Sequence, residues 1–267
     1  MNKLGLIAGN GVFPLEVADA ARRRAIHVIA IAHLRETRPE LESRVDEITW
    51  IKVGELEKII ETFRRADVTK VAMAGGISRA RLKDSFAPDA RAIKMLSGLG
   101  RMSDDSVLRG VAAEIEAEGI KVIDPVPMVE NCLAHPGLAA GPEPSESQLR
   151  DLDLAFAVAR QLGSFDIGQT VAVREGVVGA VEAVEGTDAA LRRAAALVGP
   201  RLVIAKAAKP GQDLRFDRPA IGPETIALVA EIGAAMLGVE AGVTLVLERE
   251  RTMQLAAKSK VSVYGHV

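Results

Sequence analysis

The fold is decided by residues 4–31, LGLIAGNGVFPLEVADAARRRAIHVIAI. This stretch opens with a short apolar run, passes through the glycine turn Gly9-Asn10-Gly11, and is rich in alanine and arginine from Pro14 onward. It closes with the apolar, β-branched run His27–Ile31. The order of strand, glycine turn, helix and strand predicts a βαβ unit with two parallel strands.

The same alternation continues downstream as far as residue 123. Strands are predicted within residues 45–53, at 70–73 and at 122–123, and helices are predicted over 54–66 and 106–118. Alternation of this kind is typical of a parallel sheet that is covered by helices on both faces. We therefore predict an α/β protein that begins with a Rossmann-like domain over residues 1–133.

Residues 134–147 have a different composition, with three prolines and two glycines. Because proline and glycine at this density favour an irregular connection, this stretch is predicted to be a linker. Beyond it, a hairpin is predicted around Glu175-Gly176 and a helix over residues 223–237. Residues 148–267 are therefore predicted to form a distinct, mixed α/β domain that carries the catalytic residues.

The composition limits the class of partner. The 267 residues include 34 basic and 36 acidic side chains, a formal net charge of −2, which argues against a general nucleic-acid binder. The one cysteine, Cys132, cannot form an internal disulfide, so a reducing cytoplasm is expected. No apolar run approaches the roughly 18 residues of a membrane-spanning helix.

Two glycine turns of the N-terminal half are candidate phosphate-binding loops. Gly9-Asn10-Gly11 follows the first strand, where glycines let the backbone approach a phosphate at a helix N-terminus. Gly76, Ser78 and Arg79 follow a later strand, and ligands of open α/β sheets gather at the carboxyl ends of the strands. A tight turn and a capped segment are the alternative explanations.

Adjacent carboxylates form a third candidate in this half. Asp104 and Asp105 precede a predicted helix, and because neighbouring carboxylates repel each other they favour a nearby cation. Capping of the helix N-terminus by one of them is the alternative.

Two motifs of the C-terminal half place polar residues near the ends of predicted strands. Gln169 lies at a strand start, where it is placed to hydrogen-bond a substrate, or simply to form a turn. Glu185, Thr187 and Asp188 cluster on a turn that follows a strand rich in valine and alanine. Such oxygen ligands suit Mg²⁺, whereas helix capping explains only one of them.

The most informative motif is the loop of residues 206–223. Its polar residues include Lys206, Lys209, Gln212, Asp213, Arg215, Asp217 and Arg218. Prolines and glycines fix the shape of this loop, and alternating cations and carboxylates can hold a phosphate and a metal ion together. A solvated charged loop is the alternative, although long loops of fixed shape are commonly functional.

Taken in order, these motifs resemble the LpxI-type UDP-2,3-diacylglucosamine pyrophosphatases of lipid A synthesis. The resemblance runs from about residue 3 to at least residue 235. The matching motifs are LGLIAGxGxxP at 4–14, GISR at 76–79, DDxxLR at 104–109, DIGQ at 166–169, EGTDAxLRR at 185–193 and KxxKPxQDxRxDxPxIG at 206–222.

The resemblance implies a Rossmann-like domain, a separate C-terminal domain and a lipid held between them. It implies hydrolysis with Mg²⁺, or another divalent cation such as Mn²⁺, to UMP and 2,3-diacylglucosamine 1-phosphate. Water is expected to attack the β-phosphorus, on the sugar side of the pyrophosphate. Asp217 matches the acid of the family's Gln-(Asp/Glu)-x-Arg-x-Asp motif that is tied to catalysis.

The motifs and the resemblance together give three sets of candidate residues. The catalytic set is Asp217, Asp213, Asp188, Glu185, Lys206 and Lys209, and the metal set is Asp217, Asp188 and Glu185. The substrate-binding set is Gly9, Asn10, Gly11, Gly76, Ser78, Arg79, Asp105, Gln169, Thr187, Gln212 and Arg215. The lysines and Arg215 are expected to stabilise negative charge on the phosphoryl oxygens.

The expected partner is a lipid-bearing sugar nucleotide, without nucleic acid. The acyl chains are expected in an apolar groove between the domains, and the protein is expected in the cytoplasm, in transient contact with the inner membrane. Two other functions stay open. One is a nicotinamide-dependent oxidoreductase, although Pro14 replaces the third glycine and only His33 and Glu36 follow the second strand. The other is a non-enzymatic nucleotide-binding regulator.

Overall fold

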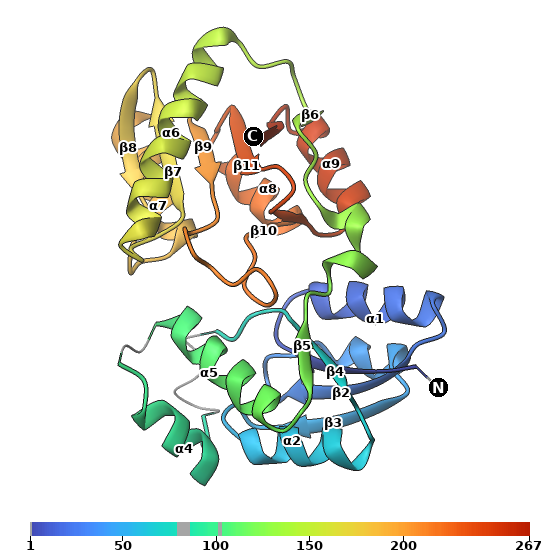
Figure 1. Cartoon of the computed structure of the whole chain (residues 1–267). Coiled ribbons are helices and arrows are strands. Elements are labelled where there is room, and N and C mark those ends of the chain that lie inside the picture. The colour runs from blue at the N-terminus through green and yellow to red at the C-terminus, as the bar shows by residue number, and fades with distance from the viewer. Residues whose placement is uncertain (1, 79–85, 101–102) are drawn as a thin grey trace. The chain divides into compact units, whose positions relative to one another are not determined.

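The computed structural model describes residues 2–78, 86–100 and 103–267. It divides into two compact units (Figure 1). The N-terminal unit consists of Met1–Glu130 together with the short segment Asp213–Asp217, and the C-terminal unit consists of Asn131–Gln212 and Arg218–Val267. A piece of the long polar loop therefore belongs to the unit formed by the first half of the chain.

The N-terminal unit contains a five-stranded sheet in the order β3-β2-β1-β4-β5. The strands are β1 (Lys3–Ala8), β2 (His27–His33), β3 (Glu47–Ile51), β4 (Lys70–Ala74) and β5 (Lys121–Ile123). All neighbouring strands in it are parallel. Because the chain moves from β1 outward to β3 and then returns to β4 on the other side of β1, the strand order reverses between β1 and β4. Ligands of such sheets bind at this point.

Helices cover both faces of this sheet. They are α1 (Phe13–Arg23), α2 (Leu56–Arg65), α4 (Ala90–Ser97) and α5 (Asp104–Ala117), with short 3-10 turns at Pro39–Arg44, Val126–Met128 and Glu130–Cys132. Phe63 of α2 and Ile115 of α5 pack in one core with Ile7 and Val71 of the central strands. Figure 1 shows α1 on the opposite face. The predicted parallel α/β architecture is confirmed for this unit.

The C-terminal unit contains a mixed six-stranded sheet in the order β6-β13-β11-β9-β7-β8. The strands are β6 (Gly137–Ala140), β7 (Thr170–Arg174), β8 (Val177–Val181), β9 (Val203–Lys206), β11 (Met236–Glu240) and β13 (Ser262–His266). The three central strands β9, β11 and β13 are parallel, whereas β6, β7 and β8 run antiparallel to their neighbours. Two further short strands, β10 (Ala220–Ile221) and β12 (Leu245–Val246), form a parallel pair.

Four helices pack on the two faces of the six-stranded sheet. They are α6 (Glu146–Ser164), α7 (Thr187–Val198), α8 (Pro223–Glu231) and α9 (Arg249–Lys258). Phe156 of α6 packs with Val171 and Val203 in one core. Leu191 of α7 and Ile226 of α8 pack with residues such as Ile204 in the other. The predicted hairpin around Glu175-Gly176 is confirmed as the antiparallel pair β7 and β8.

Two sequence-based expectations differ from the structure. The helix predicted over residues 223–237 ends at Glu231, because Gly233 adopts a left-handed conformation with φ of 67° and the chain then enters the central strand β11. The stretch 134–147, predicted as a linker, contains the edge strand β6, which pairs with β13. Proline and glycine suit an edge strand as well as a connection, so composition did not separate the two.

In the described part of the chain, no helix combines the length and the apolar character needed to cross a bilayer.

Candidate functional site

The two glycine turns of the N-terminal unit lie side by side at the carboxyl ends of β1 and β4. The Gly9 amide donates to Ala74 O at 2.8 Å, and the Asn10 amide donates to Gly76 O at 2.7 Å. A Cβ atom on Gly9 would lie 2.3 Å from Gly76 O, so only glycine allows the two backbones to approach this closely. The structure thus brings these candidates together, and it gives Gly9 a packing role whether or not a phosphate binds.

A buried carboxylate, Glu36, joins the two turns. Its side chain is 4% exposed, and Oε2 accepts hydrogen bonds from Asn10 Nδ2 and from the Ser78 amide, both at 3.1 Å. Sequence reasoning noted Glu36 only as an acid that follows β2, and the residue gave no local signal of this role. The predicted residue Arg79 lies outside the described residues.

The segment Asp213–Asp217, called the crossing segment below, is held on α5 by charged residues. Asp105 accepts from Arg109 Nε at 2.6 Å and, through Oδ1, from the Asp213 amide at 3.4 Å. Arg109 Nη1 lies 3.8 Å from Asp213 Oδ2. Asp105, predicted to bind substrate, therefore also helps to anchor the crossing segment.

Arg215 links the crossing segment to α5 and β5 through several hydrogen bonds. Its Nη2 donates to Asp213 Oδ2 at 2.8 Å, and its Nη1 donates to Glu116 Oε1 at 2.9 Å and to Val122 O at 3.4 Å. The hydrogen bonds from Arg215 hold the pKa of the Asp213 carboxyl below its usual value. In this structure Arg215 and Asp213 thus hydrogen-bond to each other and hold the segment in place. Their predicted roles toward substrate stay predictions.

The crossing segment also carries Asp217 and Phe216. The Asp217 amide donates to Asp213 O at 3.0 Å, which closes a turn at the end of the segment. Phe216, immediately before it, packs against the core of the N-terminal unit and lines a pocket there. Asp217, the acid matched to the family motif, thus directly follows a residue that lines the pocket.

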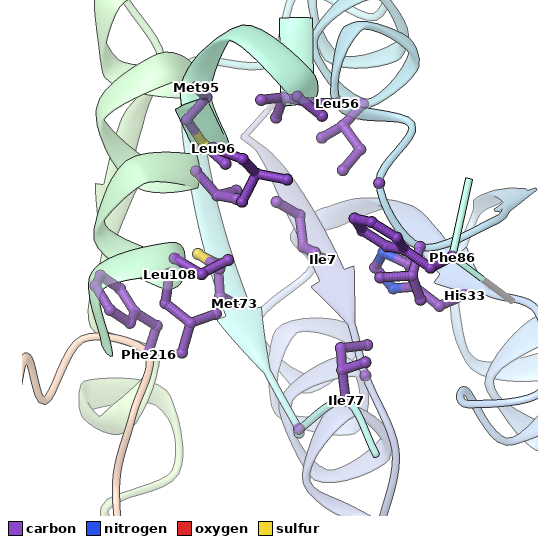
Figure 2. A pocket seen from close by; sticks show the side chains of 18 of the residues that line it. Ile7, His33, Leu56, Met73, Ile77, Phe86, Met95, Leu96, Leu108 and Phe216 are labelled. Atoms are coloured by element: carbon purple, nitrogen blue, oxygen red, sulfur yellow. The ribbon is translucent and has the colours of Figure 1, made fainter. Parts of the chain in front are cut away.

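This pocket is apolar and has a volume of about 150 Å³. Figure 2 shows Ile7, Met73, Leu108 and Phe216 on its walls, with Ile77 just beyond β4 and Phe86 beside His33. A space of about this size accepts a group about as large as benzene. The pocket was not predicted, because its walls come from three strands and three helices, and the apolar residues of these elements are typical of an ordinary core.

His33 is the polar side chain among the described residues that line the pocket. It is 6% exposed, and Nδ1 lies 2.9 Å from Ala8 O. Burial lowers the pKa of His33, while the Ala8 carbonyl and the carboxylates of Glu36 and Glu55 act in the opposite direction.

The C-terminal unit gathers a second polar group at the carboxyl end of β9. Lys206 ends this strand, and its Nζ donates to Ala220 O at 2.8 Å. Burial lowers the pKa of Lys206, and the nearby carboxylates of Glu182 and Asp188 oppose that shift. A half-buried cation at a strand end is suited to binding a phosphoryl oxygen.

Glu182 connects two predicted residues to this group. Its Oε1 accepts from Thr187 Oγ1 at 2.7 Å, and its Oε2 accepts from the Gln169 amide at 3.3 Å. Gln169 Oε1 is buried without a hydrogen-bond partner in the described residues. The structure therefore brings Gln169, Thr187 and Lys206 together around Glu182, a residue that the prediction did not include among the site residues.

The residues of the predicted metal set are divided between the two units, so this set stays a prediction. The Glu185 carboxylate accepts from Arg193 at 2.7 Å, and this hydrogen bond lowers its pKa. Asp188 is exposed at the start of α7. Asp217 belongs to the crossing segment of the N-terminal unit. Across residues 2–78, 86–100 and 103–267, no three His, Cys, Asp or Glu side chains form a group that could hold a metal ion.

Lys209 and Gln212 shape the first part of the polar loop. Lys209 Nζ pairs with Asp166 Oδ1 at 2.6 Å, and the Lys209 amide donates to Gln212 Oε1 at 2.9 Å. Both side chains thus have local partners, and their predicted roles toward substrate stay predictions.

Comparison with known proteins accounts for nearly the whole chain. Residues 3–132 match the LpxI N-terminal domain and residues 135–264 match the LpxI C-terminal domain. A relative from Caulobacter vibrioides, described as UDP-2,3-diacylglucosamine pyrophosphatase LpxI, is 37% identical over 99% of this chain and 98% of its own length. The chain belongs to the LpxI family.

The two LpxI domains, as matched along the sequence, do not coincide completely with the two compact units of the structure. The match to the LpxI C-terminal domain includes the crossing segment, which packs with the N-terminal unit. This LpxI chain therefore presents Asp217 from the part of the molecule formed by the Rossmann-like sheet.

Solved structures show only partial likeness to this LpxI chain. The biotin carboxylase subunit of pyruvate carboxylase is 16% identical, with a TM-score of 0.29, over 64% of this chain and 35% of that one. Phosphoribosylglycinamide synthetase from Anaerococcus prevotii is 13% identical, with a TM-score of 0.27, over 76% of this chain and 45% of that one. The chain spans less than half the length of either protein, and at these scores the likeness bears on no functional question.

Proposed function

We propose that this chain hydrolyses the pyrophosphate of UDP-2,3-diacylglucosamine to UMP and 2,3-diacylglucosamine 1-phosphate in lipid A synthesis. The observation that carries the proposal is its 37% identity, over nearly the full length of both chains, with a relative described by that activity. The test is release of UMP from the purified substrate. Hydrolysis in ¹⁸O-labelled water extends it, because attack on the β-phosphorus places the label in the sugar phosphate and attack on the α-phosphorus places it in UMP.

The apolar pocket supports a lipid-bearing substrate. A nucleotide sugar without acyl chains needs no apolar pocket, whereas the transfer of an acyl chain from water into such a pocket is favourable. We therefore assign the pocket of the N-terminal unit to part of one acyl chain. A groove between the domains for the rest of the lipid stays a prediction.

Asp217 is proposed to position or deprotonate the attacking water. A positioned general base commonly contributes about a hundredfold to ten-thousandfold in rate. Asp217→Asn keeps the shape of the side chain and removes its charge, so kcat should fall at least about a hundredfold while the protein stays folded. Normal UMP release by a folded Asp217→Asn variant would remove this assignment.

The matched control for that experiment is Asp153→Asn. Asp153 pairs with His266 at 3.0 Å on an exposed part of α6 and has no proposed role in the reaction. The same chemical change there should leave the rate of UMP release within twofold of wild type, which corresponds to about 0.4 kcal/mol of activation free energy.

The group around Lys206 is proposed to bind the phosphoryl oxygens. Lys206 supplies the cation, and Gln169 and Thr187 lie beside it through Glu182. Because negative charge grows on these oxygens during the attack, a cation in a partly buried site stabilises the transition state more than the ground state. Lys206→Met should therefore lower kcat more than it raises KM.

Dependence on Mg²⁺ or Mn²⁺ is part of the proposal. A preformed set of three acids is not found in the described residues, and Glu185 is engaged by Arg193. Mg²⁺ commonly binds one or two carboxylates and completes its shell with water and substrate phosphates, so Asp188 and Asp217 are the residues to test as ligands. A bound cation would neutralise the pyrophosphate. Activity should disappear with EDTA and return with added Mg²⁺.

Two other functions are separated from this one by simple assays. In a nicotinamide-dependent oxidoreductase, an acid after the second strand binds the cofactor's ribose. Here the Glu36 carboxylate binds the two glycine turns instead, which disfavours that function. Metal-dependent release of UMP would exclude a non-enzymatic regulator. We propose a cytoplasmic location with transient contact at the inner membrane, which fractionation of cells would test.

A further inference from the structure

One end of the six-stranded sheet carries three polar side chains in a row, on the neighbouring strands β8, β7 and β9 (Figure 1). Thr170 of β7 lies directly opposite Lys206 of β9, and the amide of Glu182, just beyond β8, donates to Thr170 O at 2.9 Å. The residues two positions inward on the three strands pack in one core: Ala172, Ala180 and Ile204. Because side chains two positions apart share a face of a sheet, the three polar side chains lie on that same face.

Lys206 carries the positive charge of this row. It is partly buried, and its Nζ donates to Ala220 O at 2.8 Å. A carbonyl oxygen is neutral, so this hydrogen bond does not balance the charge. An ammonium group that is withdrawn from water is costly unless a carboxylate lies nearby. The carboxylates that act on Lys206 are those of Glu182 and Asp188, and both raise its pKa against the effect of burial.

Glu182 is the better placed of the two carboxylates. Asp188 is exposed at the start of α7, where water and salt screen its charge. The Glu182 carboxylate is partly buried and is held by two hydrogen bonds, from Thr187 Oγ1 at 2.7 Å and from the Gln169 amide at 3.3 Å. Its negative charge is therefore fixed on the face of the sheet that carries Lys206.

The charge of Glu182 acts across the row without a bridging hydrogen bond. Thr170 lies between the two charged residues and is 3% exposed, and its Oγ1 is buried without a hydrogen-bond partner in the described residues. An ammonium group has three protons, and Lys206 gives one of them to Ala220 O. The other protons can therefore serve a phosphoryl oxygen, which a direct ion pair with Glu182 would prevent.

We propose that Glu182 is a positioning residue whose carboxylate balances the charge of Lys206 across the sheet and so holds the ammonium group ready for the phosphoryl oxygens. The inference rests on the proposed function, since it takes the pyrophosphate to be the ligand of Lys206. Without the carboxylate, the ammonium group loses its proton or turns toward water. In both cases less positive charge reaches the phosphoryl oxygens in the transition state.

The experiment introduces Glu182→Gln into wild type and into Lys206→Met. Glutamine keeps the shape, and its amide can accept from the Gln169 amide and donate to Thr187 Oγ1, so the charge is the main loss. In wild type, kcat for UMP release should fall about tenfold with a smaller change in KM. In Lys206→Met the same change should lower kcat no further. A normal kcat in folded Glu182→Gln, or an equal fall on both backgrounds, would overturn the inference.

Glu175→Gln is the matched control. Glu175 lies at the tip of the same hairpin, at the opposite end of β7 and β8, and its side chain is 81% exposed beside Arg174. The same chemical change there should leave kcat and KM as they are on both backgrounds. A loss equal to that of Glu182→Gln would mean that the rate depends on the hairpin as a whole and not on the charge beside Lys206.

Unfolding separates failure of the inference from failure of the proposed function. The urea midpoints of wild type, Glu182→Gln, Lys206→Met and the double variant are compared without substrate. Removal of one partner leaves the other charge uncompensated, whereas removal of both does not. The midpoint of the double variant should therefore be no lower than that of the less stable single variant, even if no substrate is hydrolysed. Additive losses would contradict the inference. If Glu182→Gln does not fold, a folded double variant supports the inference and an unfolded one contradicts it.

Discussion

At the residue scale, the burial of His33 makes the stability of the protein depend on pH. Its pKa in the folded protein lies below the ordinary value of 6.5, and desolvation is the main cause. Between the folded pKa and 6.5 the unfolded chain binds a proton that the folded chain does not, so the free energy of unfolding falls as pH drops through this window. Below the folded pKa the loss is complete and levels off.

His33→Phe should remove that part of the acid destabilisation. The variant has no group to protonate there, so its free energy of unfolding should change less between pH 7 and pH 5 than that of wild type. Urea unfolding of both proteins at the two pH values measures the difference. An equal or larger change in the variant would mean that burial of His33 is not the cause.

A second residue-scale prediction concerns two glycines of one turn. A Cβ atom on Gly9 would meet backbone, with Gly76 O at 2.3 Å, whereas Gly11 has φ of 83° and open space around it. Gly9→Ala must therefore move one strand-end turn away from the other, which should cost about 3 kcal/mol. Gly11→Ala should cost only about 1 kcal/mol, from the left-handed backbone.

Chemical denaturation of the two glycine variants measures these costs. Equal destabilisation would mean that the two turns can separate easily, and the close approach of β1 and β4 at this point would then not constrain the site.

At the element scale, the crossing segment depends on Arg215. Its side chain is 38% exposed, so its ion pairs with Asp213 and Glu116 should contribute less than about 1 kcal/mol to global stability. They fix the position of a segment that carries Asp217, however, and a displacement of about 1 Å can cost about a hundredfold in rate. Arg215→Gln should therefore lower kcat about a hundredfold with little change in the unfolding midpoint.

Arg192→Gln is the control for Arg215→Gln. Arg192 forms an exposed ion pair with Glu231 within the C-terminal unit, away from the crossing segment in sequence and contacts. Its loss should change neither kcat nor the midpoint noticeably. If the two variants lost activity to the same extent, the rate would not depend on how the crossing segment is held.

At the scale of the whole molecule, the two units have separate cores. Ile60 lies in the core of the N-terminal unit and Ile204 in that of the C-terminal unit, and both are fully buried. Each Ile→Val change removes one methylene and should cost about 1 kcal/mol. Because the two residues share no partners, the double variant should show the sum within about 0.5 kcal/mol.

Hydrogen exchange shows where each cost falls. Ile60→Val should speed amide exchange in the β1–β5 sheet and leave the β6–β13 sheet unchanged, and Ile204→Val should do the reverse. Equal acceleration in both sheets for either variant would mean that the whole chain opens as one cooperative unit.

The sequence by itself determined the parallel sheet of the first half, the hairpin of β7 and β8, and the family. These features depend on residues that are neighbours along the chain: apolar runs with strand or helix periodicity, glycine turns, and motifs in a fixed order. The same reasoning extended one helix as far as residue 237, because an apolar run such as Met236–Glu240 has no local mark that separates a buried strand from a buried helix.

Only the tertiary structure decided which of the candidate residues meet. The joining of Asn10 and Ser78 by Glu36, and the bond from the Asp213 amide to Asp105 across 108 positions, depend on how the sheet and helices pack. The pocket around His33 and the placement of Asp217 with the N-terminal unit have the same origin. Sequence patterns record the preferences of short stretches of chain, whereas a site is defined by distances that exist only after remote stretches bury their apolar faces together.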